Sequence, residues 1–140
     1  MRLLGLDIGD VLIGVAVSDP DGVIAQGLDS IRRVSLKKDI DTIIKIVNEY
    51  EIGKIIIGLP KTLDDKIGIQ AEKVLTFINF LKKGTNVPII TWDERLTTVS
   101  ANKVLIDADM SRKKRKQIAD KLSAVIILQG YLDTNEHQNG

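Results

Sequence analysis

The sequence predicts an α/β protein with one mixed five-stranded sheet and helices on both of its faces. Three observations lead to this fold class. The N-terminal segment carries three β-rich runs separated by turn signals, which is typical of an antiparallel meander. Two later segments are short and continuously apolar, which indicates parallel strands buried on both faces. Apolar residues at helical spacing surround these two strands, so the predicted order is βββαβαβαα.

The meander is expected to occupy the first part of the chain. Residues 2–8 and 11–18 read as two strands of a hairpin, with Gly9 and Asp10 between them. The stretch 19–22, Asp-Pro-Asp-Gly, is a turn because proline presets one φ angle and glycine accepts a positive one. A third strand over 23–31 then returns antiparallel.

Helices and buried strands alternate after the meander. Apolar spacing predicts a helix over 36–50, with Gly53 as its stop signal. The run KIIIGLP, residues 54–60, predicts a buried strand. A second helix is expected over 67–83, closed by Gly84.

The C-terminal part begins with a second buried strand over 87–92, which leads into Asp93-Glu94-Arg95. Two helices are expected after it, over 96–107 and 112–132. We expect residues 1–133 to form a single domain and 134–140 to be a disordered polar tail.

Composition narrows the chemistry that the chain can perform. There is no cysteine, and the single histidine, His137, lies in the polar tail, so thiol catalysis, zinc–thiolate sites and a Ser-His-Asp triad are excluded. The net charge is +1, so any nucleic-acid affinity must come from local placement of charge. Without a membrane-length apolar run or a signal-peptide layout, we expect a cytoplasmic protein with no membrane partner.

Asp7 raises the first functional question. It lies within GLDIGD, in a strand that should enter the core. Burying an ionised carboxylate costs several kcal/mol unless a cation meets it. Asp7 therefore has a structural partner, or it serves a metal, a phosphate or a proton.

Other carboxylates are expected near the same edge of the sheet. Asp93 and Glu94 end the last strand, and the carboxyl ends of parallel strands meet at one edge. Asp120, in the final helix, shares a face with Ser123 and Ala124, whose small side chains would let the helix approach the sheet. The same face carries Lys113, Lys116 and Ile127, and the opposite, apolar face is expected to comprise Ile118, Leu122, Val125 and Ile126.

Three remote carboxylates without histidine or cysteine suit a hard cation, Mg²⁺ or Mn²⁺. Two such ions about 4 Å apart can activate water and stabilise the leaving oxygen of a phosphodiester. Structural roles stay open for each residue: a cap or turn for Asp7, a local ion pair with Arg95 for Glu94, and a partner of Lys116 for Asp120. Asp10, Asp19 and Asp21 read as turn residues.

A basic run precedes the last predicted helix. Ser111 is a candidate N-cap, and five consecutive cations follow it, against the preference of a helix N-terminus for negative groups. A bound phosphate chain would relieve this conflict, whereas the alternative is a solvated cationic face. The candidate nucleic-acid contacts are Arg95, Arg112, Lys113, Lys114, Arg115 and Lys116.

The sequence resembles the YqgF/RuvX family, which includes pre-16S rRNA nucleases and Holliday junction resolvase-like proteins. The resemblance covers residues 2–133 and is carried by LLGLDIGD, IGVAVSDP, IIIGLP, QAEKV, DERLTTVSA and SRKKRKQIADKLSAVIILQGYLD. It implies an RNase H-like fold and a metal-dependent nuclease whose catalytic and metal-binding residues are Asp7, Glu94 and Asp120. Its implied partners are small-subunit rRNA precursor or branched DNA. The family often has a basic pair where Val11 and Leu12 stand, so a phosphate contact at that turn is in question.

Three functions compete. The first is a Mg²⁺-dependent endonuclease on structured RNA, with branched DNA as the alternative substrate. The second is phosphotransfer, because DIG in a hairpin also resembles the phosphate loop of actin-like kinases, although 140 residues leave no room for their second domain. The third is a non-catalytic RNA-binding module for ribosome assembly. The oligomeric state, a monomer or a weak dimer, is left open.

Overall fold

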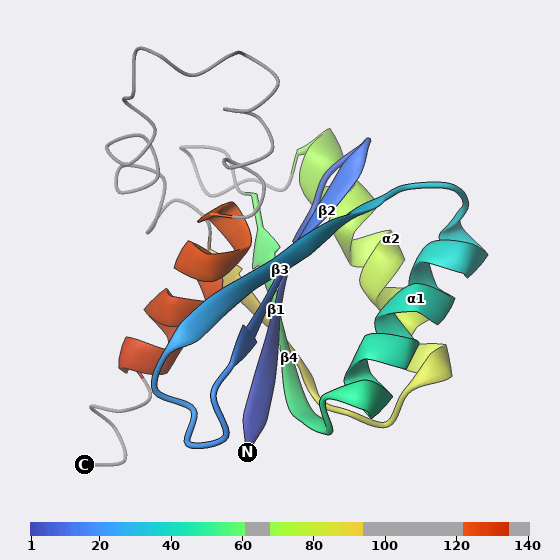
Figure 1. Ribbon diagram of the computed structural model, residues 1–140. Coiled ribbons are helices and arrows are strands. Elements are labelled where there is room, and N and C mark those ends of the chain that lie inside the picture. Colours follow the sequence, from blue (N-terminus) through green and yellow to red (C-terminus); the bar gives the residue numbers. More distant parts are fainter. Residues whose placement is uncertain (61–67, 94–121, 135–140) are drawn as a thin grey trace, which may run out of the picture.

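The computed structural model describes residues 1–60, 68–93 and 122–134 (Figure 1). Its elements are β1 (Arg2–Ile8), β2 (Leu12–Ser18), β3 (Ala25–Arg32), α1 (Leu36–Glu49), β4 (Ile52–Leu59), α2 (Ile69–Gly84) and β5 (Ile89–Asp93). A further helix over 122–134, here called the C-terminal helix, follows. The predicted helix over 96–107 and the first part of the one over 112–132 lie outside the described residues.

The five strands form one mixed sheet in the order β3-β2-β1-β4-β5. β1 is antiparallel to β2 and parallel to β4, which is in turn parallel to β5. β2 is antiparallel to β3. This confirms the predicted combination of a three-stranded meander and two parallel strands.

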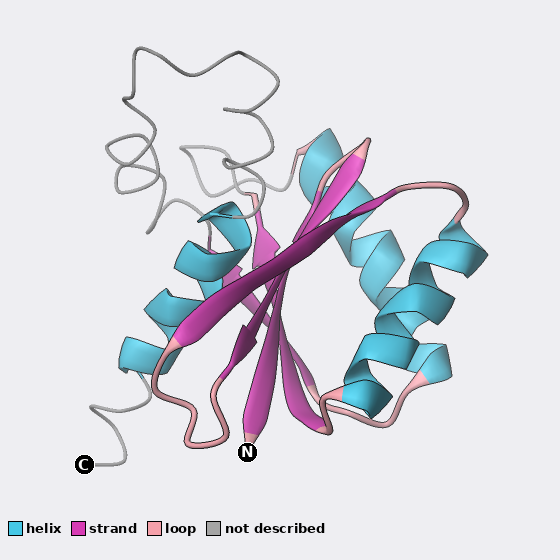
Figure 2. Cartoon of the chain, viewed as in Figure 1, coloured by secondary structure: helices cyan, strands magenta, loops and turns pink. Residues whose placement is uncertain are grey.

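Helices cover both faces of the sheet, as predicted. α1 and α2 lie on one face and the C-terminal helix lies on the other (Figure 2). The larger core, under α1 and α2, includes Leu4, Leu6, Ile13, Val15, Ile43, Ile55, Ile57, Val74, Phe77 and Leu81. The smaller core, under the C-terminal helix, comprises Leu3, Ala16, Ile56, Ala124, Ile127, Leu128 and Leu132.

Strand alternation sorts the residues of β1 between these two cores. Leu4, Leu6 and Ile8 belong to the core under α1 and α2, and Leu3 belongs to the other. Because successive side chains of a strand point to opposite faces, Gly5 and Asp7 share the face of Leu3. The candidate residue Asp7 therefore lies on the face that carries the C-terminal helix.

Gly53 as a helix stop was a wrong prediction. α1 ends at Glu49, and the chain reverses at Glu51, whose φ is 54°. The reversal is so short that the buried Ile52 already begins β4. Gly53 lies inside that strand, where a Cβ would overlap the side chain of Met1.

The third strand begins at Ala25 instead of the predicted residue 23. The backbone N–H groups of Val23 and Ile24 donate to Asp19 Oδ1 at 2.7 and 2.8 Å. These bonds close the turn and take Val23 out of the strand ladder. They confirm Asp19 as a turn residue.

The apolar face predicted for the C-terminal helix was wrong apart from Val125, which packs against the smaller core. Leu122, Val125 and Ile126 are half-buried, and Ile118 lies outside the described residues. The fully packed face is formed by Ala124, Ile127, Leu128 and Leu132. The helix also continues to Thr134, one residue into the predicted tail.

Candidate functional site

Asp7 lies at the carboxyl end of β1, half-buried, on a part of the sheet that carries few side chains. Gly14 is its partner on β2. Gly5 precedes it by two residues on the same face. On β4, one step beyond the Leu6–Ile57 pair, Gly58 comes next to Asp7. The carboxylate thus stands among three glycines, where a ligand could approach the backbone closely.

The C-terminal helix packs directly on this surface. A Cβ on Gly5 would lie 2.7 Å from Leu128 Cβ and 3.1 Å from the carbonyl oxygen of Ala124. This contact confirms that small residues bring the helix close to the sheet beside Asp7. The contact also explains why the packed face of the helix differs from the predicted one, because Ala124 and Leu128 pack against the bare backbone at Gly5.

The start of the C-terminal helix points toward the edge that carries Asp7. Near the other end of the helix, Lys54 Nζ at the start of β4 donates to Tyr131 Oη at 3.2 Å. Gln129 Oε1 accepts from Ala25 N at 2.9 Å, at the start of β3. β1, β3 and β4 run in the same direction, so the helix runs antiparallel to them (Figure 1).

Alternation along β5 assigns Asp93, the last residue of that strand, to one face of the sheet. Ile90 and Trp92 pack against the core under the C-terminal helix, whereas Ile89 packs on the α1 and α2 side. Asp93 has the phase of Ile89, and therefore the face opposite to Asp7. Trp92 has the phase of Asp7 and pairs with Gly58, the residue next to Asp7 on β4.

Most of the predicted site falls beyond what the structure describes. Asp7 is described; the others, namely Glu94, Arg95, Arg112, Lys113, Lys114, Arg115, Lys116 and Asp120, lie outside the described residues. Among residues 1–60, 68–93 and 122–134, no three acidic or histidine side chains gather closely enough to hold a metal ion. In the same ranges, no helix has the length and apolarity needed to cross a bilayer.

The hairpin turn after Asp7 is contacted by a cationic side chain from α2. Val11, in this turn, is 53% exposed. Lys73 of α2 lies 3.3 Å from Asp10 Oδ1, with both side chains more than half exposed. Sequence reasoning missed Lys73, Gly14 and Gly58. The two glycines were detectable as breaks in apolar strand patterns, whereas the approach of Lys73 depends on tertiary packing.

Comparison with known proteins points to one family. A family model described as RuvX, Holliday junction resolvase, matches residues 1–134. A protein of Thermoanaerobacter pseudethanolicus named "Putative pre-16S rRNA nuclease" is 56% identical over 139 residues, covering 99% of this chain and 100% of that protein. A protein of Clostridium tetani with the same name is 56% identical over 134 residues, covering 96% and 97%.

Two solved structures share the fold at low identity. Thermus thermophilus RuvC in complex with a Holliday junction substrate aligns with a TM-score of 0.61 at 10% identity, over 98% of this chain and 96% of that one. The fowlpox virus Holliday junction resolvase aligns with a TM-score of 0.57 at 14% identity, over 96% and 99%. These alignments confirm the RNase H-like fold that the family resemblance implied.

Proposed function

This chain belongs to the RuvX family, described as Holliday junction resolvases, and we propose that it is a divalent-metal-dependent endonuclease for structured nucleic acid. The substrate proposed first is the small-subunit rRNA precursor, because relatives more than half identical to the chain carry the name pre-16S rRNA nuclease. One structural observation carries the proposal. A half-buried carboxylate, Asp7, stands among glycines at the carboxyl end of the central strand, on the face that carries the C-terminal helix.

Asp7, Glu94 and Asp120 are proposed as the metal ligands and catalytic residues. Glu94 follows Asp93 directly, so one more residue of β5 would give it the phase of Trp92 and hence the face of Asp7. This supports Glu94 over Asp93 as a ligand.

The spacing of the C-terminal helix supports Asp120. Ala124 lies against Gly5, and Asp7 lies two strand residues beyond Gly5, about 6.6 Å along β1. Asp120 precedes Ala124 by four residues, which is about 6 Å along a helix axis. If the helix extends back as the sequence predicts, Asp120 would reach the level of Asp7.

The donor set is all oxygen, which fits Mg²⁺ or Mn²⁺ and disfavours softer metals. When bound, the metal would supply the Lewis acid for hydrolysis of the phosphodiester by water. The protein would place its three carboxylates around the ion, and the glycines beside Asp7 would leave room for the phosphate backbone.

Arg95 and the basic run Arg112–Lys116 are proposed to hold the nucleic acid. In the sequence the run precedes Asp120 by four to eight residues, so its charges would lie near the metal ligands. Contacts of lysine and arginine with phosphates add affinity without reading the bases. They would therefore suit a substrate recognised by its shape.

A branched DNA substrate is the second candidate, favoured by the description of the family. A cleavage assay with Mg²⁺ on precursor rRNA and on a four-way DNA junction distinguishes the two candidate substrates. We expect cleavage of the RNA, lost with EDTA and lost in Asp7→Asn. Asp93→Asn, on the opposite face, is the matched control and should cleave normally.

Cleavage of the junction alone would transfer the assignment to branched DNA. RNA binding without turnover, unchanged in Asp7→Asn, would instead favour the non-catalytic assembly module. Undiminished cleavage by a folded Asp7→Asn protein would contradict the proposed site.

A further inference from the structure

We propose that Arg33 and Asp39 form a positioning pair that fixes the hairpin turn after β1 and, through it, the carboxylate of Asp7. This inference rests on the proposed function, since it concerns the geometry of the metal site. It assigns a role to two residues that lie far from the family's acidic positions in the sequence.

Asp39 is the buried anchor of the pair. It lies in the first turn of α1 with 2% of its surface exposed. Its Oδ2 accepts from Arg33 Nε at 3.1 Å, and its Oδ1 accepts from the backbone N–H of Val34 at 3.0 Å. A carboxylate this deeply buried requires such partners, so the position of Arg33 is set by α1.

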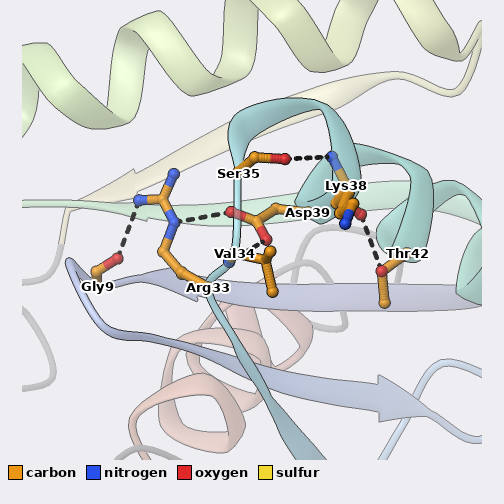
Figure 3. Close-up of polar contacts among 7 residues, drawn as sticks. All are labelled: Gly9, Arg33, Val34, Ser35, Lys38, Asp39 and Thr42. Atoms are coloured by element: carbon orange, nitrogen blue, oxygen red, sulfur yellow. Dashed lines mark hydrogen bonds and ion pairs between the residues drawn. The ribbon is translucent and has the colours of Figure 1, made fainter.

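Arg33 carries that anchoring to the hairpin turn. Its Nη1 donates to the carbonyl oxygen of Gly9 at 3.1 Å, while Nε holds Asp39, so one planar guanidinium spans both groups (Figure 3). The backbone N–H of Arg33 also donates to Val11 O at 2.9 Å. The guanidinium lies 5.4 Å from the ring centre of Phe77, which adds a contact from α2.

The turn itself has little freedom. Gly9 N donates to Leu12 O at 3.0 Å, and a Cβ on Gly9 would lie 2.5 Å from the same oxygen. Gly9 follows Asp7 by two residues. Fixing the carbonyl of Gly9 therefore fixes the end of β1 from which Asp7 projects.

A metal site needs its ligands held to within about 0.5 Å, usually by residues that support the ligands themselves. The Arg33 and Asp39 pair meets this need because it joins the end of β1 to β3, α1 and α2. The nearby ion pair of Lys73 and Asp10 does not, since both of its side chains are largely in solvent.

Arg33→Lys tests the positioning role. Lysine keeps the charge beside Asp39, but its single ammonium lacks the fork that contacts Asp39 and Gly9 together. We expect the full-length variant to stay folded and to bind Mn²⁺ about tenfold more weakly in a titration without substrate. Its kcat should fall while the KM for nucleic acid is unchanged. Lys73→Gln, which removes the α2 cation that contacts Asp10 of the same turn, is the matched control and should bind Mn²⁺ like the wild type.

Asp39→Asn is an independent second variant, because it keeps the shape of Asp39 while weakening its hold on Arg33. It should shift Mn²⁺ affinity in the same direction. Wild-type Mn²⁺ affinity in both folded variants would overturn the positioning role. A loss of Mn²⁺ affinity that is fully explained by unfolding of the variants, as measured in urea, would overturn it as well. If Asp7→Asn also bound Mn²⁺ normally, the metal site itself would be misassigned, which is a separate failure.

Discussion

A Cβ on Gly5 would lie 2.7 Å from Leu128 Cβ, so the C-terminal helix rests on the bare backbone of β1. Gly5→Ala should therefore push the helix away from the sheet and destabilise the fold by about 1–3 kcal/mol. Urea unfolding measures the loss. The exposed Gln26 of β3 gives a control, Gln26→Ala, which should stay within about 0.5 kcal/mol of the wild type. Equal stability of Gly5→Ala and wild type would show that the helix does not seat there.

The reversal between α1 and β4 offers a stabilising substitution. Glu51 has a φ of 54°, a region that costs a residue with a side chain about 1–2 kcal/mol. Glycine would remove this cost, but it also raises the conformational entropy of the unfolded chain, which offsets part of the gain. Glu51→Gly should therefore raise the free energy of unfolding by up to about 1 kcal/mol. Glu49→Gly, two residues earlier in α1, should lower it by a similar amount. A loss of stability in Glu51→Gly would contradict the left-handed turn.

The turn at Asp19 predicts a dependence on acidic pH. Hydrogen bonds from the backbone N–H groups of Ile24 and Val23 hold the pKa of Asp19 below its usual value of 3.8. A carboxyl whose pKa is lowered by folding contributes stability above its unfolded pKa, and this contribution is lost as the pH falls through the folded pKa. The stability difference between wild type and Asp19→Asn should thus shrink as the pH drops below about 3.8. An NMR titration giving Asp19 a pKa of 3.8 or higher would contradict the turn bonds.

The basic run predicts a salt-dependent affinity for nucleic acid. Lys113→Gln with Lys114→Gln should weaken binding and reduce the slope of log affinity against log salt by about 1–2, since each lost phosphate contact removes about 0.7–0.9. Lys82→Gln with Lys83→Gln is the matched control. These two lysines lie in the last turn of α2, ahead of β5 and away from the Asp7 edge. An unchanged salt slope in the Lys113→Gln, Lys114→Gln variant would show that the basic run is a solvated cationic face that does not contact phosphates.

β4 was predictable because its continuous apolar run is typical of a strand buried on both faces, and alternation along β1 already predicts that Asp7 shares the face of Gly5. The same interpretation was wrong for the run over 87–92, because β5 lies at the edge of the sheet and none of its residues is fully buried. The direction of the parallel strands then followed from the helices between them. That is why the edge that carries Asp7 was predicted correctly.

The packed face of the C-terminal helix was not predictable in the same way. Ile126 and Ile127 are both apolar, so the sequence is compatible with either of two helix faces packing on the sheet. The contact with Gly5, on a strand remote in the sequence, selects the face of Ala124 and Leu128. Arg33 and Asp39 were missed for a similar reason. In the sequence they resemble ordinary surface charges, because their contacts with each other and with Gly9 depend on how α1 packs beside the hairpin turn. The roles of Glu94 and Asp120 still rest on strand phase, helix spacing and family resemblance.

Titration of the full-length protein with Mn²⁺, without nucleic acid, tests most directly whether three remote carboxylates share one metal site. We predict binding that is lost or greatly weakened in Asp7→Asn, Glu94→Gln and Asp120→Asn, and retained in Asp93→Asn, whose side chain has the opposite strand phase. Wild-type binding by a folded Asp7→Asn protein, or loss of binding in Asp93→Asn but not in Glu94→Gln, would contradict the account.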